Sequence, residues 1–232
     1  EQQLKKIKAE KLKWLYRLLG STVIAILTVV IVFLTTPVAT STLVSILVFM
    51  VLLGLIFYIK PRLMYASFKH KYVLLLYLSN KPYKVSETFD SRWINMILKS
   101  GFKYFHQSDD FDVMFRISKG VEKNIFNVNN MLEIITIFKN NDIDFYGDDL
   151  HHVYKNLWIN HNQKRQINKQ VILQIKKYDE ISDDIVEKLN EVTLFNESKN
   201  YLITVNIGYF ANNKTIYYLH SEKYNPNVYY KY

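Results

Sequence analysis

The strongest pattern in the chain is a long hydrophobic stretch close to its start. No charged side chain occurs among the 42 residues from Leu18 to Ile59. A helix rises 1.5 Å per residue, so about 20 residues cross a bilayer core of about 30 Å. The stretch therefore predicts two membrane-spanning helices, near Leu18–Leu34 and Leu43–Ile59, joined by a reversal at Thr35–Thr42 that contains the helix-breaking Pro37.

Basic residues flank both predicted spans and are missing between them. Residues 1–17, predicted as a basic cytosolic helix, contain six Lys and Arg against two Glu, and Lys60, Arg62, Lys69 and Lys71 follow the second span. Lys and Arg close to a span keep its flank in the cytosol. The sequence therefore predicts a multi-pass plasma-membrane protein with both termini cytosolic. The predicted anchors at the cytosolic interface are Trp14, Tyr16, Arg17, Tyr58 and Lys60.

Two alternatives to membrane helices account for the hydrophobic stretch less well. A cleaved signal peptide has a basic start, but its apolar part is about 7 to 15 residues long and no second span follows it directly. A buried hairpin of a soluble protein keeps a polar stripe, which is missing here. Neither span contains Asp, Glu, Lys, Arg or His, the residues that mark ion paths. We therefore expect an anchor, with a pore of several copies lined by Thr and Ser as the alternative.

The segment that follows mixes helical and strand patterns, which predicts one cytosolic α+β domain over residues 60–232. Pro61 predicts a break in the helix, and residues 62–78 fit either a helix or a buried strand. Met131–Phe138 also fits either state, and we favour a helix. Further helices are predicted at Arg92–Lys99, begun by Asp90 or Ser91 and ended by Gly101, from Asp148 or Asp149 to about Trp158, and after Ser182. Strands are predicted at Phe102–Phe105, Val113–Ile117, Asn124–Val128 and Gln170–Ile175, with a terminal hairpin of Tyr201–Phe210 and Lys214–His220.

Charge and composition narrow the classes of function. About half of the net charge of +9 lies in residues 1–17 and at Lys60, and residues 61–232 hold 23 basic against 19 acidic side chains. Membrane topology explains this excess, so nucleic acid is the less favoured partner. The lack of cysteine removes disulfides, thiolate nucleophiles and Cys-ligated zinc. The abundance of Lys, Asn, Ile and Tyr is typical of an AT-rich bacterial genome.

No motif in the chain predicts a particular reaction. Neither a Gly-rich phosphate loop nor a Gly-x-Ser-x-Gly elbow occurs. His151 and His152 are adjacent, so a helix would point them about 100° apart, and no metal-ligand spacing accompanies them. Carboxylates gather at Asp109, Asp110 and Asp112, at Asp142 and Asp144, and at Asp183 and Asp184, and Glu197-x-Lys199 has the spacing of a nuclease motif. These patterns are common by chance, so we expect no catalytic residue, metal site or cofactor.

One basic stretch is a candidate contact surface. Acidic residues are absent between Asp149 and Asp179, where six basic side chains occur, at Lys155, Lys164, Arg165, Lys169, Lys176 and Lys177. Such a group beside a membrane anchor suits anionic lipid headgroups, at about 1 kcal/mol per residue. A polyanion such as nucleic acid is an alternative ligand, and a solvated face paired with the acidic segment downstream is equally consistent.

Two functions of different classes follow from these patterns. The first is a non-enzymatic membrane-anchored assembly or adaptor subunit, whose cytosolic domain docks a protein partner or further copies of the chain, with the Tyr-rich segment Tyr224–Tyr232 as a docking element. The second is an oligomeric pore-forming or ligand-sensing membrane effector. A membrane-tethered nuclease or other hydrolase is third, and it requires Asp109, Asp110 and Asp112 to converge with another carboxylate.

Overall fold

The chain forms two compact units, Glu1–Tyr77 and Leu78–Tyr232, in a computed structural model. The structure describes residues 2–86, 89–119, 130–165, 167–197 and 200–224, of which 162–165, 168, 194–197 and 200–201 are described for the backbone alone.

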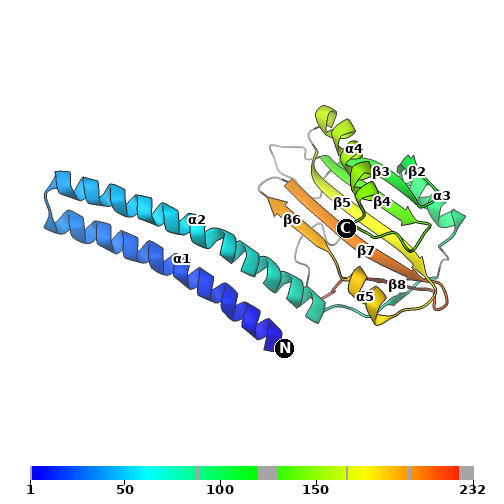
Figure 1. Ribbon diagram of the computed structural model, residues 1–232, viewed down its shortest axis with the longest axis horizontal. Helices are drawn as coiled ribbons and strands as arrows, with labels where there is room; N and C mark the ends of the chain where they lie inside the picture. Colours follow the sequence, from blue (N-terminus) through cyan, green and yellow to red (C-terminus); the bar gives the residue numbers. More distant parts are fainter. Residues whose placement is uncertain (1, 87–88, 120–129, 166, 198–199, 225–232) are drawn as a thin grey trace. The chain divides into compact units, whose positions relative to one another are not determined.

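The first unit is an antiparallel helical hairpin of α1 (Gln2–Thr35) and α2 (Val38–Tyr77) (Figure 1). Both helices are long and apolar enough to cross a membrane. The reversal is shorter than predicted, because helix resumes at Val38 directly after Pro37. Hydroxyl groups explain the difference: Thr42 Oγ1 donates to Val38 O at 2.8 Å and Ser41 Oγ donates to Pro37 O at 2.8 Å. These side chains bond to helical carbonyls one turn back, and therefore do not require a loop.

Helix α2 continues through Pro61, where the sequence predicts a break. Proline removes one backbone donor, but the ladder of hydrogen bonds persists on both sides of it. Packing within the hairpin extends past this point, since Ala66 of α2 is 1% exposed and Ile7 of α1 is 5% exposed. Tertiary packing therefore overrides the local preference of proline, and the hairpin extends well beyond the charge-free stretch.

The second unit is built on a mixed eight-stranded sheet of order β1-β8-β7-β5-β4-β3-β2, with β6 also paired to β7. Its strands are β1 (Tyr83–Lys84), β2 (Lys103–Gln107), β3 (Phe111–Lys119), β4 (Asn130–Phe138), β5 (Ile167–Tyr178), β6 (Thr193–Glu197), β7 (Asn200–Phe210) and β8 (Thr215–Tyr218). The central strands β4, β5 and β7 are parallel to one another, and the outer pairs are antiparallel. Parallel strands require crossovers, which helices provide here.

Helices cover both faces of this sheet (Figure 1). Helix α4 (Asp148–Arg165) connects β4 to β5, and α5 (Asp183–Leu189) follows β5. Both pack on one face, against a core that includes Leu132, Ile134, Ile172 and Phe210. Helix α3 (Ser91–Lys99) packs on the other face, where Ile97 meets a second core of Phe102, Met114, Ile135, Ile137 and Ile175.

Sequence predictions of these elements divide into three groups. The helix at Arg92–Lys99, with Asp90 as its N-cap, the two strands after it and the terminal hairpin are confirmed. The favoured helix at Met131–Phe138 is wrong, because these residues form β4, which is buried on both faces between β3 and β5. A strand that is buried on both faces has a continuous apolar run, and this run resembles a buried helix. The strand predicted at Asn124–Val128 lies outside the described residues.

Candidate membrane interface and ligand pocket

Four side chains from the two helices of the hairpin meet where the charge-free stretch begins and ends. The rings of Trp14 and Tyr58 lie 6.4 Å apart, edge to face. The guanidinium of Arg17 lies 4.7 Å from the Trp14 ring, and that of Arg62 lies 3.6 Å from the Tyr58 ring and 5.6 Å from Trp14. Arg62 also donates to Tyr58 O at 2.9 Å. We call Trp14, Arg17, Tyr58 and Arg62 the girdle cluster.

The girdle cluster contains three of the five predicted interface anchors. Tyr16 and Lys60 are exposed on the helix surfaces. Arg62 was missed as an anchor because Pro61 predicts that the helix ends before it. Aromatic rings with cations stacked on them combine an apolar body with a polar edge, which is the composition of a membrane–water boundary.

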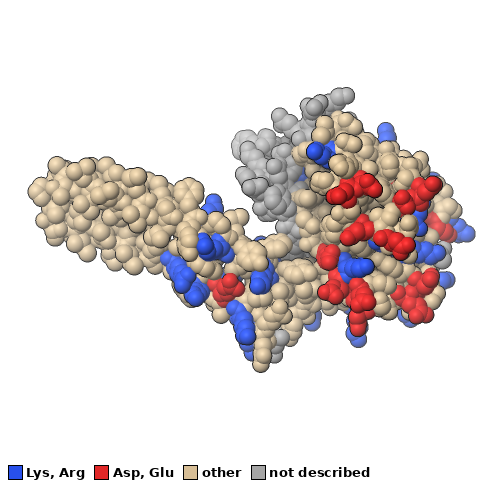
Figure 2. All heavy atoms as spheres, viewed as in Figure 1, with Lys and Arg blue, Asp and Glu red and all other residues tan. Residues whose placement is uncertain are grey.

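The excess of positive charge belongs almost entirely to the hairpin. Residues 1–77 contain ten Lys and Arg against two Glu, whereas residues 78–232 contain 20 against 19. Figure 2 shows these basic side chains gathered at one end of the hairpin, with none along the rest of its length. The basic flanks and the apolar stretch are therefore two segments of the same continuous helices.

The predicted basic surface of the second unit is divided by the fold. Lys155 and Lys177 are exposed, but Lys169 and Lys176 are 2% and 3% exposed. The side chains of Lys164 and Arg165 lie outside the described residues. A buried lysine is not accessible to a headgroup, so two of the six side chains do not contribute to a lipid contact.

Lys176 forms hydrogen bonds to the loop between β4 and α4 and does not face solvent. Its ammonium donates to Asn141 O at 3.3 Å and to Ile143 O, and it lies 4.3 Å from the centre of the Phe145 ring. Desolvation lowers the pKa of Lys176 from 10.5 to about 8, against the opposing effect of Asp144. Between about pH 8 and 10.5 the Lys176 amine therefore holds fewer protons in the folded chain than in the unfolded chain, and the contribution of this group to stability rises with pH in that window.

A row of polar side chains crosses the buried centre of the sheet beneath α4. Thr136, Gln174 and Asn206 lie side by side on β4, β5 and β7, and none is more than 1% exposed. Tyr154 of α4 shares hydrogen bonds with Thr136 Oγ1 at 2.6 Å and Gln174 Nε2 at 3.1 Å, and burial raises the pKa of its phenol. We call Thr136, Gln174 and Asn206 the polar row.

Asn206 joins the polar row to the end of α5. Its Nδ2 donates to Lys188 O at 3.1 Å, in the last turn of α5, and to Glu191 O at 3.0 Å, just after the helix. Tyr146 donates to the same Glu191 carbonyl at 2.9 Å. The polar row therefore connects three strands to both crossovers, and its hydrogen bonds serve the fold.

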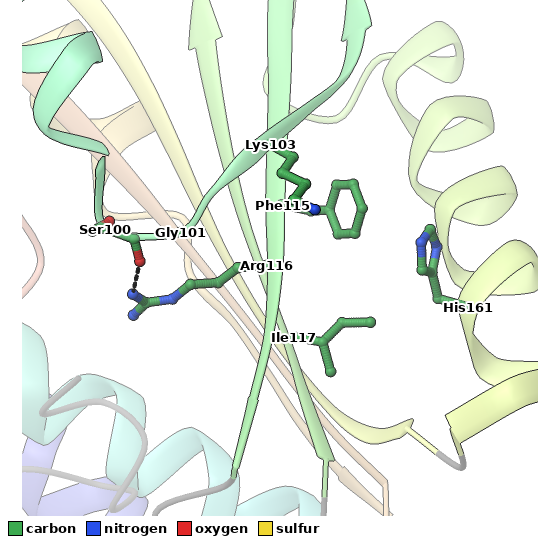
Figure 3. Close-up of a pocket in the computed structure, with 7 residues that line it drawn as sticks. All are labelled: Ser100, Gly101, Lys103, Phe115, Arg116, Ile117 and His161. Carbon is green, nitrogen blue, oxygen red and sulfur yellow. Dashed lines mark hydrogen bonds between the residues drawn. The ribbon is translucent and has the colours of Figure 1, made fainter. Parts of the chain in front are cut away.

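A pocket of about 450 Å³ opens at the end of the sheet where β2 begins, and its lining is drawn in Figure 3. Phe115 and Ile117 of β3 point toward His161 of α4, while Arg116 points to the other side of the strand, toward Ser100. The described lining residues are Ser100, Gly101, Lys103, Phe115, Arg116, Ile117 and His161. They come from the turn after α3 and from β2, β3 and α4, and they share no sequence spacing, which is why no pattern in the sequence predicts this pocket.

Two carboxylates of the Asp109, Asp110 and Asp112 group, which a hydrolase would require to converge, make separate contacts. Asp112 pairs with Lys139 at 2.8 Å, and Asp110 Oδ1 accepts from Asn140 Nδ2 at 3.3 Å. Within the described parts of the chain, no three His, Asp or Glu side chains are placed to hold a metal ion, and His151 and His152 are exposed. Lys199 of the Glu197-x-Lys199 pair lies outside those parts.

Comparison with known proteins identifies no relative. No protein-family model matches the chain, and neither the curated proteins nor the solved structures contain a significant match. The geometry of the two units is therefore the basis for assigning a function.

Proposed function

We propose that the protein is a two-pass plasma-membrane protein whose hairpin is an anchor, with both termini in the cytosol, and whose second unit docks a protein partner or further copies of the chain. The observation that carries the proposal is the girdle cluster. Its members come from both helices and lie at one level, at the boundary between the charge-free stretch and the basic flanks.

The dimensions of the hairpin support this proposal. The charge-free part is 18 residues long in α1, from Leu18 to Thr35, and 22 residues long in α2, from Val38 to Ile59. At 1.5 Å per residue these lengths are about 27 and 33 Å, which fit a bilayer core of about 30 Å. Trp14 and Tyr58 would lie at the headgroups, with the Arg17 and Arg62 guanidinium groups toward phosphate. The tip around Pro37 has no charge to resist translocation, and both basic flanks oppose it.

The topology is tested by cysteine labelling, for which the cysteine-free chain gives no background. Ala39→Cys places a thiol at the exposed tip of the hairpin and Asn212→Cys places one in the exposed turn between β7 and β8. We expect an impermeant thiol reagent to label Ala39→Cys in intact cells and Asn212→Cys only after lysis. Labelling of Asn212→Cys in intact cells would overturn the orientation, and extraction of the chain from membranes by alkaline carbonate would overturn the anchor.

The docking role is tested by the assembly state in mild detergent. We expect the purified chain to run as a defined homo-oligomer or with a stoichiometric protein partner. A monodisperse monomer without a partner would contradict this half of the proposal and leave the anchor intact, because membrane insertion is measured independently.

A ligand-sensing or pore-forming membrane effector is the second candidate, and the pocket of the second unit favours it. A ligand in that pocket would contact both β3 and α4, which carry the lining residues Phe115 and His161. Ion or dye leakage from liposomes that contain the purified chain is the discriminating measurement. Leakage supports the effector, and intact liposomes with or without ligand support the anchor. The hydrolase candidate receives no support from the described carboxylates.

A further inference from the structure

The pocket at the start of β2 combines two recognition features on one side of the sheet. Lys103 stands directly opposite Phe115 in the pairing of β2 with β3, so the two side chains share the face that α4 covers. Phe115 in turn lies against His161, with ring centres 4.6 Å apart at 56°. Figure 3 shows Lys103, Phe115, Ile117 and His161 facing the same space.

The aromatic wall of the pocket is held in a fixed orientation. His161 Nδ1 lies 3.0 Å from Leu157 O, and because a carbonyl only accepts, Nδ1 carries the hydrogen. That assignment leaves Nε2 of the neutral ring as an acceptor for a donor on a ligand. Ile117 adds an aliphatic surface next to the two rings. Planar rings bind to walls of this kind by stacking, whatever their substituents.

The charge of the pocket is positive at Lys103. Arg116 forms an ion pair with Glu133 at 2.6 Å and donates to Ser100 O at 2.9 Å. The carboxylate of Glu133 therefore neutralises the charge of Arg116, on the side of β3 that faces away from Phe115. None of the described lining residues is a carboxylate. Lys103 is exposed, and the structure records no ion pair for it among the described residues. An anionic group near Lys103 would therefore meet one cation and, among the described lining residues, no carboxylate.

We propose that this pocket binds a mononucleotide, with the base stacked on Phe115 and His161 and the phosphate on Lys103. The volume of about 450 Å³ lies within the range of small-molecule sites. The proposal requires both parts of the ligand: a nucleoside lacks the group that Lys103 recognises, and inorganic phosphate lacks the ring. It is independent of the proposed anchor role, since the pocket lies wholly within the second unit.

The test is calorimetric titration of the full chain in detergent micelles with AMP, GMP, CMP, adenosine and inorganic phosphate as probes. We expect at least one nucleotide to bind, and to bind about tenfold or more tightly than adenosine or phosphate. Lys103→Gln should weaken that nucleotide about tenfold and leave adenosine unchanged. Lys155→Gln removes an exposed lysine from the same helix as His161 and is the matched control, with no expected change.

Three outcomes would overturn the proposal. They are no heat of binding for any of the three nucleotides at millimolar concentration, equal affinity for nucleotide and nucleoside, and equal loss in the Lys103→Gln and Lys155→Gln variants. Since Phe115 contributes to the core, Phe115→Leu is read together with the melting temperature. A variant that keeps its melting temperature and loses affinity for both AMP and adenosine places the base on Phe115, and a variant that keeps both affinities contradicts that placement.

Discussion

Replacement of Gly208 by alanine is expected to destabilise the second unit, although alanine is normally favoured over glycine in a strand. A Cβ atom on Gly208 would lie 2.5 Å from Leu189 Cδ1 and 3.1 Å from Cζ of Phe210. Leu189 and Phe210 are both fully buried, so neither has open space to move into. Overpacking of this kind costs about 1–3 kcal/mol, and the loss of glycine's backbone freedom offsets about 0.5–1 kcal/mol of it.

The middle of these ranges gives a net loss of about 1 kcal/mol, which corresponds to a fall of about 2–4 °C in melting temperature for a unit of this size. Thermal unfolding in detergent, followed by the fluorescence of Trp93 and Trp158, measures it. Gly147→Ala is the control, because its nearest neighbour, Asp144 O, would lie at an ordinary 3.6 Å. A Gly208→Ala variant as stable as the parent would refute the contact between α5 and β7. Leu189→Ala in the same chain should remove the clash and make the two losses less than additive.

Three further changes have defined outcomes in the same unfolding assay. Asp90→Ala should cost about 1 kcal/mol and Asp90→Asn much less, because Asp90 Oδ1 accepts from Arg92 N at 2.9 Å and caps α3. Between pH 8 and 10 the parent chain should gain stability relative to Lys176→Met, since the pKa of Lys176 is lowered to about 8; parallel pH profiles of the two chains would contradict this assignment. Tyr154→Phe should cost about 1–2 kcal/mol by leaving Thr136 and Gln174 short of a partner; additivity with Thr136→Val would contradict the hydrogen bond.

The sequence alone predicts an element correctly where residues close together in the chain determine its start and its end. The N-cap Asp90 with Gly101 after the helix locates α3, and Ala211–Asn213 locates the hairpin of β7 and β8. The sequence alone fails where contacts with residues far away in the chain determine the secondary structure. Residues 131–138 form a strand because β3 and β5 flank them, and α2 runs through Pro61 because α1 packs against it.

The girdle cluster and the pocket also differ in how far the sequence alone predicts their residues. The proposed anchors Trp14, Arg17 and Tyr58 follow from composition, because a membrane boundary selects residue types rather than exact positions. The pocket does not follow from composition, since Lys103, Phe115 and His161 meet only after a strand pairing and a crossover helix bring them together. Burial of Lys169 and Lys176 was equally hidden, because positive charge in a sequence gives no sign of the face on which a strand residue lies.

The polar row has a consequence for how uniquely the sheet assembles. A slip of one residue between β4 and β5 would turn apolar side chains to the wrong face, but a slip of two would leave the apolar pattern intact. In the native pairing Gln174 lies beside Thr136, whereas a two-residue slip would set its amide beside Ile134 or Phe138. An amide buried without partners costs about 1–3 kcal/mol. Thr136, Gln174 and Asn206 therefore specify the register of the strands. They destabilise a sheet slipped by two residues, which the hydrophobic pattern alone would permit.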